Sequence, residues 1–314
     1  MFNTRKWVLL IEHTYGYPLG VIDDTDPPLY YARVENEIGK YMVAPPYGDF
    51  IHLTERSAHQ ISNYLNTKSD CAARIKVCVP NEQAIKSMNP ERSGYVHQIN
   101  FPSYGEWNQN LIRGKFRNQI IQGRKNGLTA RVSTEKRSLL EFWELHAKLR
   151  LTKFGEIPQP KSFFLNLYRS YLEENAGFVI SAYNSESELI AGVVILLDSD
   201  TAYYKFAASN LDALSARPNN FLIDHLIKYL EGLGLNKLNL GYTGDSANYN
   251  GLRKYKLAAG ATELVRYNLK TDHCDSLDHK VVKDVNHMVT NLINQNPKLE
   301  DVDKFSERYY KYFI

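Results

Sequence analysis

The chain has 314 residues, a formal net charge of +3 and 43% hydrophobic residues. This length suits two domains of ordinary size, and the charge is too small to indicate nucleic-acid binding. No stretch approaches the roughly 18 consecutive apolar residues of a membrane span, so we expect no span and a cytoplasmic location. The cysteines, Cys71, Cys78 and Cys274, lack metal-ligand spacing, which suits a reducing compartment.

The first hundred residues have the pattern of short strands around one helix. Apolar runs predict strands at residues 7–11, 18–22, 29–34 and 51–53, and residues 73–79 alternate polar and apolar as a half-buried strand does. Residues 57–65 carry apolar side chains at helical spacing. A proline-rich loop at residues 44–49 separates two of these strands.

From residue 107 helices dominate and then give way to strands. We predict helices at residues 107–125, 138–149 and 162–173, a short strand at 131–133, and a β-hairpin at 177–183 and 189–197. His146 has helical spacing with Leu139, Phe142 and Trp143, which favours a packed or surface histidine over a catalytic one.

The stretch from residue 203 to 261 reads as strand, loop, helix, strand, loop, helix, strand. A β-rich run at residues 202–207 leads through a loop at 209–220 to an amphipathic helix at 221–233. A strand at 237–240, a glycine- and asparagine-rich loop at 241–251 and a short helix at 252–258 follow. Loops of this kind in α/β units carry ligand sites, so we expect the functional site here.

The C-terminal residues give a weaker pattern. A helix is predicted at residues 281–293, and the aromatic run at 305–314 is expected to pack on the N-terminal domain. His273, Cys274, Asp278 and His279 have no zinc-site spacing. We therefore predict no metal site and interpret this region as a solvated linker.

Several runs in this sequence resemble the Fem family. These aminoacyltransferases build peptidoglycan cross-bridges and are relatives of the GNAT acetyltransferases. The runs include Arg-Pro-Asn-Asn-Phe-Leu at residues 217–222, Asn-Leu-Gly at 239–241 and Gly-Leu-Arg-Lys-Tyr-Lys at 251–256. Upstream runs at residues 115–118, 124–128 and 149–155 extend the resemblance to about Trp107. The order and spacing of these runs carry the resemblance, since no single one is specific.

The resemblance implies an α+β fold with a mixed sheet and two GNAT-like domains in tandem. We expect a trimmed N-terminal GNAT-like domain at residues 1–105, a transferase domain at 106–270 and a C-terminal helix and tail at 271–314 that returns to the first domain. The chain departs from the family in its short N-terminal half. It also lacks a charged heptad pair that could form a tRNA-contacting coiled-coil arm.

The resemblance implies that an aromatic–lysine pair takes part in the transfer. Here the pair is Tyr255 and Lys256, with Lys256 stabilising the oxyanion and Tyr255 shaping the pocket. The alternative for Lys256 is a surface helix cation. Asp245 is a candidate for taking the amine proton or binding the acceptor, and the alternative is a turn former.

Substrate-binding candidates come from the strand, loop and helix around this pair. Tyr204 and Lys205 lie on the central strand, where alternation allows only one of them to point inward. The other candidates are Arg217, Asn219 and Asn220 of the loop, Arg124 from the run at 124–128, and Tyr47. Tyr47 belongs to the loop at 44–49, which resembles a turn that Fem relatives place between strands, facing the interdomain cleft; the alternative is a proline-stiffened loop. The loop at residues 209–220 contains no glycine, which disfavours close approach of a CoA pyrophosphate, so we expect no cofactor.

Three functions remain open at this point. The first is a Fem-like transferase that moves an aminoacyl group from aminoacyl-tRNA to an amine on a cell-wall precursor or peptide. The second is an acyl-CoA-dependent N-acyltransferase acting on an amino sugar or another small amine. The third is a non-catalytic GNAT-like binding protein.

Overall fold

The computed structural model describes residues 1–67, 72–271, 273–274, 277–278 and 280–314. Its strands are β1 (Leu19–Ile22), β2 (Leu29–Asn36), β3 (Gly39–Ala44), β4 (Ile51–His52), β5 (Ala72–Cys78), β6 (Glu91–Asn100), β7 (Thr129–Ser133), β8 (Gly177–Tyr183), β9 (Leu189–Asp198), β10 (Thr201–Ser209), β11 (Lys237–Gly244) and β12 (Thr262–Lys270). Its α-helices are α1 (Arg5–Tyr15), α2 (Glu55–Thr67), α3 (Tyr104–Glu106), α4 (Gly114–Lys125), α5 (Lys136–Leu149), α6 (Lys161–Leu167), α7 (Pro218–Gly232), α8 (Asn250–Ala258), α9 (Lys280–Asn294) and α10 (Leu299–Tyr309).

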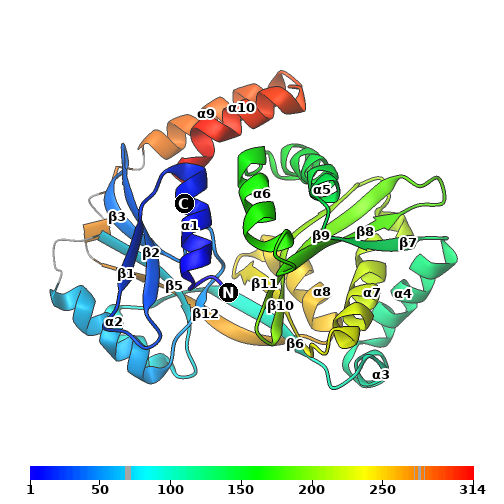
Figure 1. Ribbon diagram of the computed structural model, residues 1–314, viewed down its shortest axis with the longest axis horizontal. Coiled ribbons are helices and arrows are strands. Elements are labelled where there is room, and N and C mark those ends of the chain that lie inside the picture. Colours follow the sequence, from blue (N-terminus) through cyan, green and yellow to red (C-terminus); the bar gives the residue numbers. More distant parts are fainter. Residues whose placement is uncertain (68–71, 272, 275–276, 279) are drawn as a thin grey trace.

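The described strands form one mixed sheet in the order β1-β2-β3-β5-β12-β6-β11-β10-β9-β8-β7, with β4 paired to β5. Strand β12 lies between the N-terminal strands β5 and β6, and β6 pairs on its other side with β11, so strands from the two halves of the chain interleave here. Figure 1 shows α2 beside the first group of strands and α4, α5 and α7 beside the second. The predicted fold class, an α+β protein with a mixed sheet, is confirmed.

The first element is a helix, so the predicted strand at residues 7–11 is wrong. Thr4 caps α1 by accepting the N–H of Trp7, and Gly16 ends the helix in a left-handed conformation. Trp7, Val8, Leu10 and Ile11 are all buried. Because α1 packs both on α6 and near β2, it is apolar on more than one side, and this run looks like that of a buried strand.

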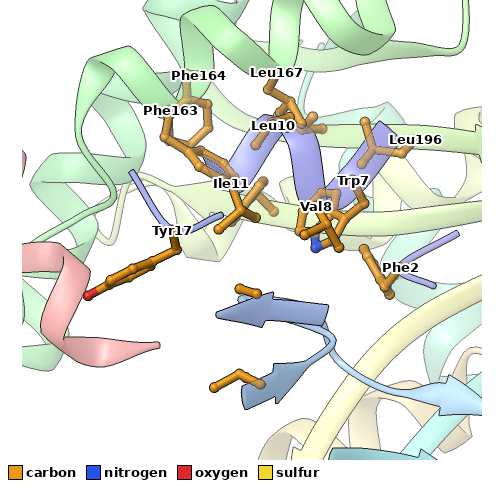
Figure 2. Packing of buried hydrophobic residues seen from close by; sticks show 14 of the residues in the cluster. Phe2, Trp7, Val8, Leu10, Ile11, Tyr17, Phe163, Phe164, Leu167 and Leu196 are labelled. Atoms are coloured by element: carbon orange, nitrogen blue, oxygen red, sulfur yellow. The ribbon is translucent and has the colours of Figure 1, made fainter. Parts of the chain in front are cut away.

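Helix α1 belongs to a core that joins the two halves of the chain. Figure 2 shows its buried side chains beside Phe163, Phe164 and Leu167 of α6 and Leu196 of β9. The indole N–H of Trp7 donates to the carbonyl of Pro46 at 2.7 Å, which also ties the loop at residues 44–49 to this core. That loop is therefore held firmly where it meets β10.

The long helix expected at residues 107–125 is interrupted. A π-helical turn covers Trp107–Leu111, Ile112 is extended, and α4 begins at Gly114. The N–H of Arg113 donates to the carbonyl of Ala258 at the end of α8, so tertiary contact competes with helix continuity here. Trp107, Phe116 and Ile120 are buried as predicted. Similar π-helical turns extend α5 and α6, at Arg150–Phe154 and Tyr168–Leu172.

The C-terminal segment lies against the N-terminal elements, and α9 and α10 run across the top of the molecule in Figure 1. The hydroxyl of Tyr17 donates to the carbonyl of Lys311 at 3.0 Å, and that of Tyr47 donates to the carbonyl of Tyr310 at 3.0 Å. The division at residues 105 and 270 stays a proposal, because the strands on both sides of it share one sheet.

Cys78 and Cys274 are buried free thiols, whereas Cys71 and His279 lie outside the described residues. Within the described ranges, no cluster of three or more metal-ligating side chains occurs. None of the described helices is long and apolar enough to cross a membrane.

Candidate active site

The candidate site lies where β10 and β11 separate. These parallel strands pair only from Thr201 to Tyr203 on β10, opposite Lys237 to Asn239 on β11. Just past this point β10 has an irregularity between Tyr204 and Phe206 in its pairing with β9. Strand β11 has one between Asn239 and Gly241 in its pairing with β6. The sheet therefore opens in its middle, and side chains from both strands reach the opening.

A cavity of about 770 Å³, which we call the α8 cavity, lies beside this opening. Its size falls within the roughly 300–1,000 Å³ of small-molecule sites. Its inner wall includes Tyr204, Leu240 and Lys256, and its rim comes from the loop after β10, the start of α8 and the π-helical turn after α5. The rim residues expose large apolar side chains: Phe154, Leu211, Leu214, Tyr249 and Leu252.

Lys256 is buried and its ammonium is held by the main chain of β11. Its Nζ donates to the carbonyl of Gly241 at 3.1 Å and to that of Tyr242 at 3.0 Å. An ammonium has three N–H donors, so one remains for a group in the α8 cavity. Burial lowers the pKa of Lys256 to about 8, and the charge of Asp49 opposes this shift. The alternative interpretation as a surface helix cation is wrong, since only 6% of the residue is exposed.

Tyr255 and Tyr204 form the aromatic part of the same wall. The ring of Tyr255 lies 5.4 Å from that of Phe116, which packs α8 against α4. The hydroxyl of Tyr255 is buried and has no hydrogen-bond partner among the described residues. Burial raises the pKa of both phenols, so both are uncharged near neutral pH.

A second cavity, of about 370 Å³, lies on the N-terminal side of β10, and we call it the basic cavity. The side chains that define it are Tyr47, Asp49, Lys76, His146, Arg150, Lys205 and Arg266. Alternation places Lys205 on the face opposite Tyr204, and the irregularity in β10 keeps Phe206 on that same face. The Nζ of Lys205 donates to the carbonyl of Tyr47 at 3.0 Å and lies 3.5 Å from Asp49 Oδ1.

The structure brings together only part of the predicted set. Lys256, Tyr255, Tyr204 and Asn219 line the α8 cavity, and Lys205 and Tyr47 line the basic cavity. Tyr204 and Lys205 thus face different cavities, in agreement with strand alternation.

Four candidates line neither cavity. Asp245 forms an ion pair with Arg92 at 3.2 Å and is exposed. Arg124 pairs with the buried Asp224 at 2.7 Å. Arg217 donates to Gln122, and Asn220 donates to Gln119. The last three contacts join α7 to α4, whereas the Asp245 pair joins the end of β11 to β6.

Sequence reasoning did not select Asp49, Lys76 and Arg266. Asp49 ends the proline-rich loop, and its neighbour Tyr47 was the candidate taken from that loop. Lys76 and Arg266 lie on the adjacent strands β5 and β12. The alternation of polar and apolar residues along these strands does not predict which cavity the two side chains face. His146 is packed as predicted, with its ring near Phe142 and Phe206, and burial lowers its pKa to about 4.

The loop between β10 and α7 uses its own main-chain donors. The N–H groups of residues 210, 212, 213, 214, 216 and 217 donate to acceptors within the loop or to β9. Pro218 at the start of α7 has no N–H, and Arg217 before it is in a left-handed conformation. A pyrophosphate cradle requires free N–H groups at this place, and the bonded groups leave few of them in the loop, so its fit to a CoA pyrophosphate is poor.

Comparison with known proteins gives a family for the second half of the chain. Residues 112–257 match the family model of the acetyltransferase (GNAT) domain. No curated protein sequence matches the chain.

Solved structures share the fold of almost the whole chain. FemX is similar with a TM-score of 0.65 and 13% identity over 86% of this chain and 92% of that one. L-PGS from Bacillus licheniformis has a TM-score of 0.52 and 10% identity over 85% of this chain and 86% of that one. The strand–loop–helix–strand–helix unit from β10 to α8 lies within the matched domain. Residues 112–257 therefore match an acetyltransferase (GNAT) domain, and most of the chain has the fold of FemX.

Proposed function

We propose that the protein transfers an acyl or aminoacyl group to an amine at the opening between β10 and β11. The observation that carries this proposal is the ammonium of Lys256, which keeps one N–H for the α8 cavity after bonding Gly241 and Tyr242. A fixed, buried donor beside an acyl carbonyl stabilises the oxyanion that forms in the transition state.

An acceptor bound as an ammonium first loses one proton to solvent. Its amine nitrogen then attacks the acyl carbonyl carbon and a C–N bond forms. The bond from that carbon to the leaving oxygen or sulfur breaks, and the proton lost by the amine goes to the leaving group. Lys256 holds the carbonyl oxygen while its negative charge develops, and Tyr255 and Tyr204 form the uncharged wall beside it.

Aminoacyl-tRNA is the donor that we propose within this class. Phe154 and Tyr249 expose aromatic rings at the rim of the α8 cavity, 49% and 41% exposed, and such rings stack on unpaired bases. Acyl-CoA is disfavoured because most N–H groups of the loop before α7 are already bonded. A donor of this kind implies a cytoplasmic protein.

The acceptor is proposed to be an amine on a cell-wall precursor or peptide that enters from the basic cavity. This cavity lies on the opposite face of β10 from the donor and offers the carboxylate of Asp49 to an ammonium. Donor and acceptor would then meet across the opening in the sheet, as two-substrate transfer requires.

A binding and transfer comparison tests the proposal. Charged tRNA and a set of acyl-CoAs are each offered to the protein, and binding and amide formation are measured. Binding of charged tRNA with transfer supports the proposal. Transfer from acyl-CoA alone would favour the amino-sugar acyltransferase, and binding of an amine without any transfer would favour a non-catalytic protein.

A further inference from the structure

The basic cavity holds four cationic side chains around a single carboxylate, that of Asp49. We propose that it binds an acceptor carrying both an amine and an anionic group, with the ammonium on Asp49 and the anion on Lys76 and Arg266. The inference rests on the proposed function for the role of the amine, but its binding chemistry is testable by itself.

Asp49 is the group for the amine. Its carboxylate lines the basic cavity, 26% of its side chain is exposed, and its Lys205 contact at 3.5 Å is too long for a strong bond. Its Oδ2 lies 3.1 Å from where a Cβ on Gly241 would stand. Gly241 in turn accepts from Lys256, so an ammonium on Asp49 would lie close to the oxyanion donor.

Lys76 is the proposed partner of the acceptor's anionic group. No hydrogen bond or ion pair to its ammonium occurs among the described residues, although its side chain is partly buried and lines the cavity. Burial and the neighbouring charges of Arg266 and Lys205 lower its pKa to about 8. A cation held in this way is destabilised until an anion pairs with it.

Arg266 adds fixed donors beside Lys76. Its Nε donates to the carbonyl of Asp49 at 2.7 Å and its Nη1 donates to Ser93 at 3.1 Å, while Tyr242 covers its face. A guanidinium has five N–H donors, so donors remain for a ligand. The guanidinium is only slightly exposed and cannot turn away.

The other charged groups around the basic cavity do not neutralise its excess of positive charge. Arg150 forms an ion pair with Glu156, and Lys205 is bonded to the carbonyl of Tyr47. His146 is neutral near pH 7 because burial lowers its pKa to about 4. A simple amine would therefore be repelled by the net positive charge, whereas an amine attached to an anion is attracted.

The size of the cavity limits the ligand to the end of an acceptor. About 370 Å³ is near the lower bound of small-molecule sites, so the amine and the anion must be close neighbours in the acceptor. A carboxylate and a phosphate both satisfy Lys76 and Arg266, and the two sources are separated by the probes below.

Calorimetric titration of the full chain tests the proposal with five small probes. Phosphoethanolamine and β-alanine carry an amine with a phosphate or a carboxylate. Ethyl phosphate and propionate carry the anion alone, and ethylamine carries the amine alone. We expect one of the two-group probes to bind about tenfold or more tightly than its matching anion, and ethylamine not to bind.

Two variants and two controls test separately the part of the basic cavity that binds the amine and the part that binds the anion. Asp49→Asn should lower the affinity for the two-group probe about tenfold and leave the anion-only probe unchanged or tighter. Lys76→Met should weaken both probes about tenfold. Asp23→Asn and Lys283→Met, which change exposed residues away from both cavities, should bind as the natural protein does. Thermal unfolding confirms that each variant folds.

Several results would overturn the proposal. The first is equal affinity for the two-group and the anion-only probes. The second is an equal loss of affinity for both probes in Asp49→Asn, and the third is no binding of any probe. Lys256→Met should bind the probes normally, because it changes only the oxyanion donor. Normal probe binding without any acyl transfer therefore refutes the proposed function and leaves this inference in place, and transfer without probe binding does the reverse.

Discussion

The ammonium of Lys256 donates to the carbonyl of Gly241 at 3.1 Å, across the point where β11 separates from β10. This bond joins helix α8 to the opening in the sheet. It also lies between the two cavities, because a Cβ added at Gly241 would stand 3.1 Å from Asp49 Oδ2. The α8 cavity, the basic cavity and the proposed oxyanion donor therefore come together near one glycine.

Lys256→Met is expected to lower turnover by about 10²–10³, the usual effect of losing one oxyanion donor. Methionine keeps the length of the side chain and removes the charge. Donor affinity should change much less, since the interaction strengthens only as charge develops. The matched control is Lys254→Met on the exposed side of α8, which should behave as the natural protein in steady-state kinetics. Turnover within about threefold of the natural protein would exclude Lys256 from the chemistry.

Stability should rise as the pH increases from about 7.5 to 8.5. Lys256 and Lys76 each have a folded-state pKa of about 8, against 10.5 for an unperturbed lysine. The unfolded chain therefore binds more protons in this window, and stability increases with pH. From about pH 9 upwards Cys78 and buried tyrosines such as Tyr15 and Tyr47, whose pKa values burial raises, oppose the trend, since only the unfolded chain ionises them there. Urea unfolding at pH 7.5 to 8.5 measures the slope, which Lys76→Met should reduce.

Gly241→Ala should destabilise the protein by about 1–2 kcal/mol, because Gly241 has a φ of +72°. The added Cβ would also stand 3.1 Å from Asp49 Oδ2, so the affinity for the amine should fall as well. Gly114→Ala is the control, because no atom lies within 4 Å of its added Cβ and it begins a helix. An unfolding curve of Gly241→Ala equal to that of the natural protein would contradict the tight contact.

Phe154→Ala combined with Tyr249→Ala should raise the KM for the tRNA donor about tenfold or more, with little change in kcat. Each exposed ring offers a stacking surface to an unpaired base, and a base stacked on an aromatic ring is worth about 1–3 kcal/mol. Tyr229→Ala removes a comparably exposed aromatic ring outside both cavities and serves as the control. A fall in kcat alone, with KM unchanged, would mean that the rim does not bind the donor.

The sequence predicts the second half of the fold well because its signals are local. Alternation between residues 177 and 209, the glycine after α7 and the short helix with Tyr255 and Lys256 all recur in the structure. The strands β3 and β6 were missed, and α1 was taken for a strand. The reason for α1 is physical: its apolar residues from Trp7 to Ile11 are consecutive, as in a buried strand, and the polar residues that mark its exposed face lie only at its two ends.

The candidate site was predicted only where its residues lie close together in the sequence. Lys256 and Tyr255 follow one another in a short motif, so the resemblance reaches them. Asp49, Lys76 and Arg266 come from a loop and two strands that are distant in sequence and adjacent only in the folded sheet. Asp245 and Arg124 lie in or beside the motifs of the resemblance. Their ion pairs with Arg92 and Asp224 hold their side chains outside both cavities.

The most direct measurement follows radiolabelled amino acids from a mixture of charged tRNAs into amide products. The reactions contain amine-bearing cell-wall peptides, with the natural protein or Lys256→Met, and parallel reactions replace the tRNA with labelled acetyl-CoA. The account predicts amide from charged tRNA, about 10²–10³ less of it with Lys256→Met, and none from acetyl-CoA. Product from acetyl-CoA alone, formed equally well by Lys256→Met, would contradict it.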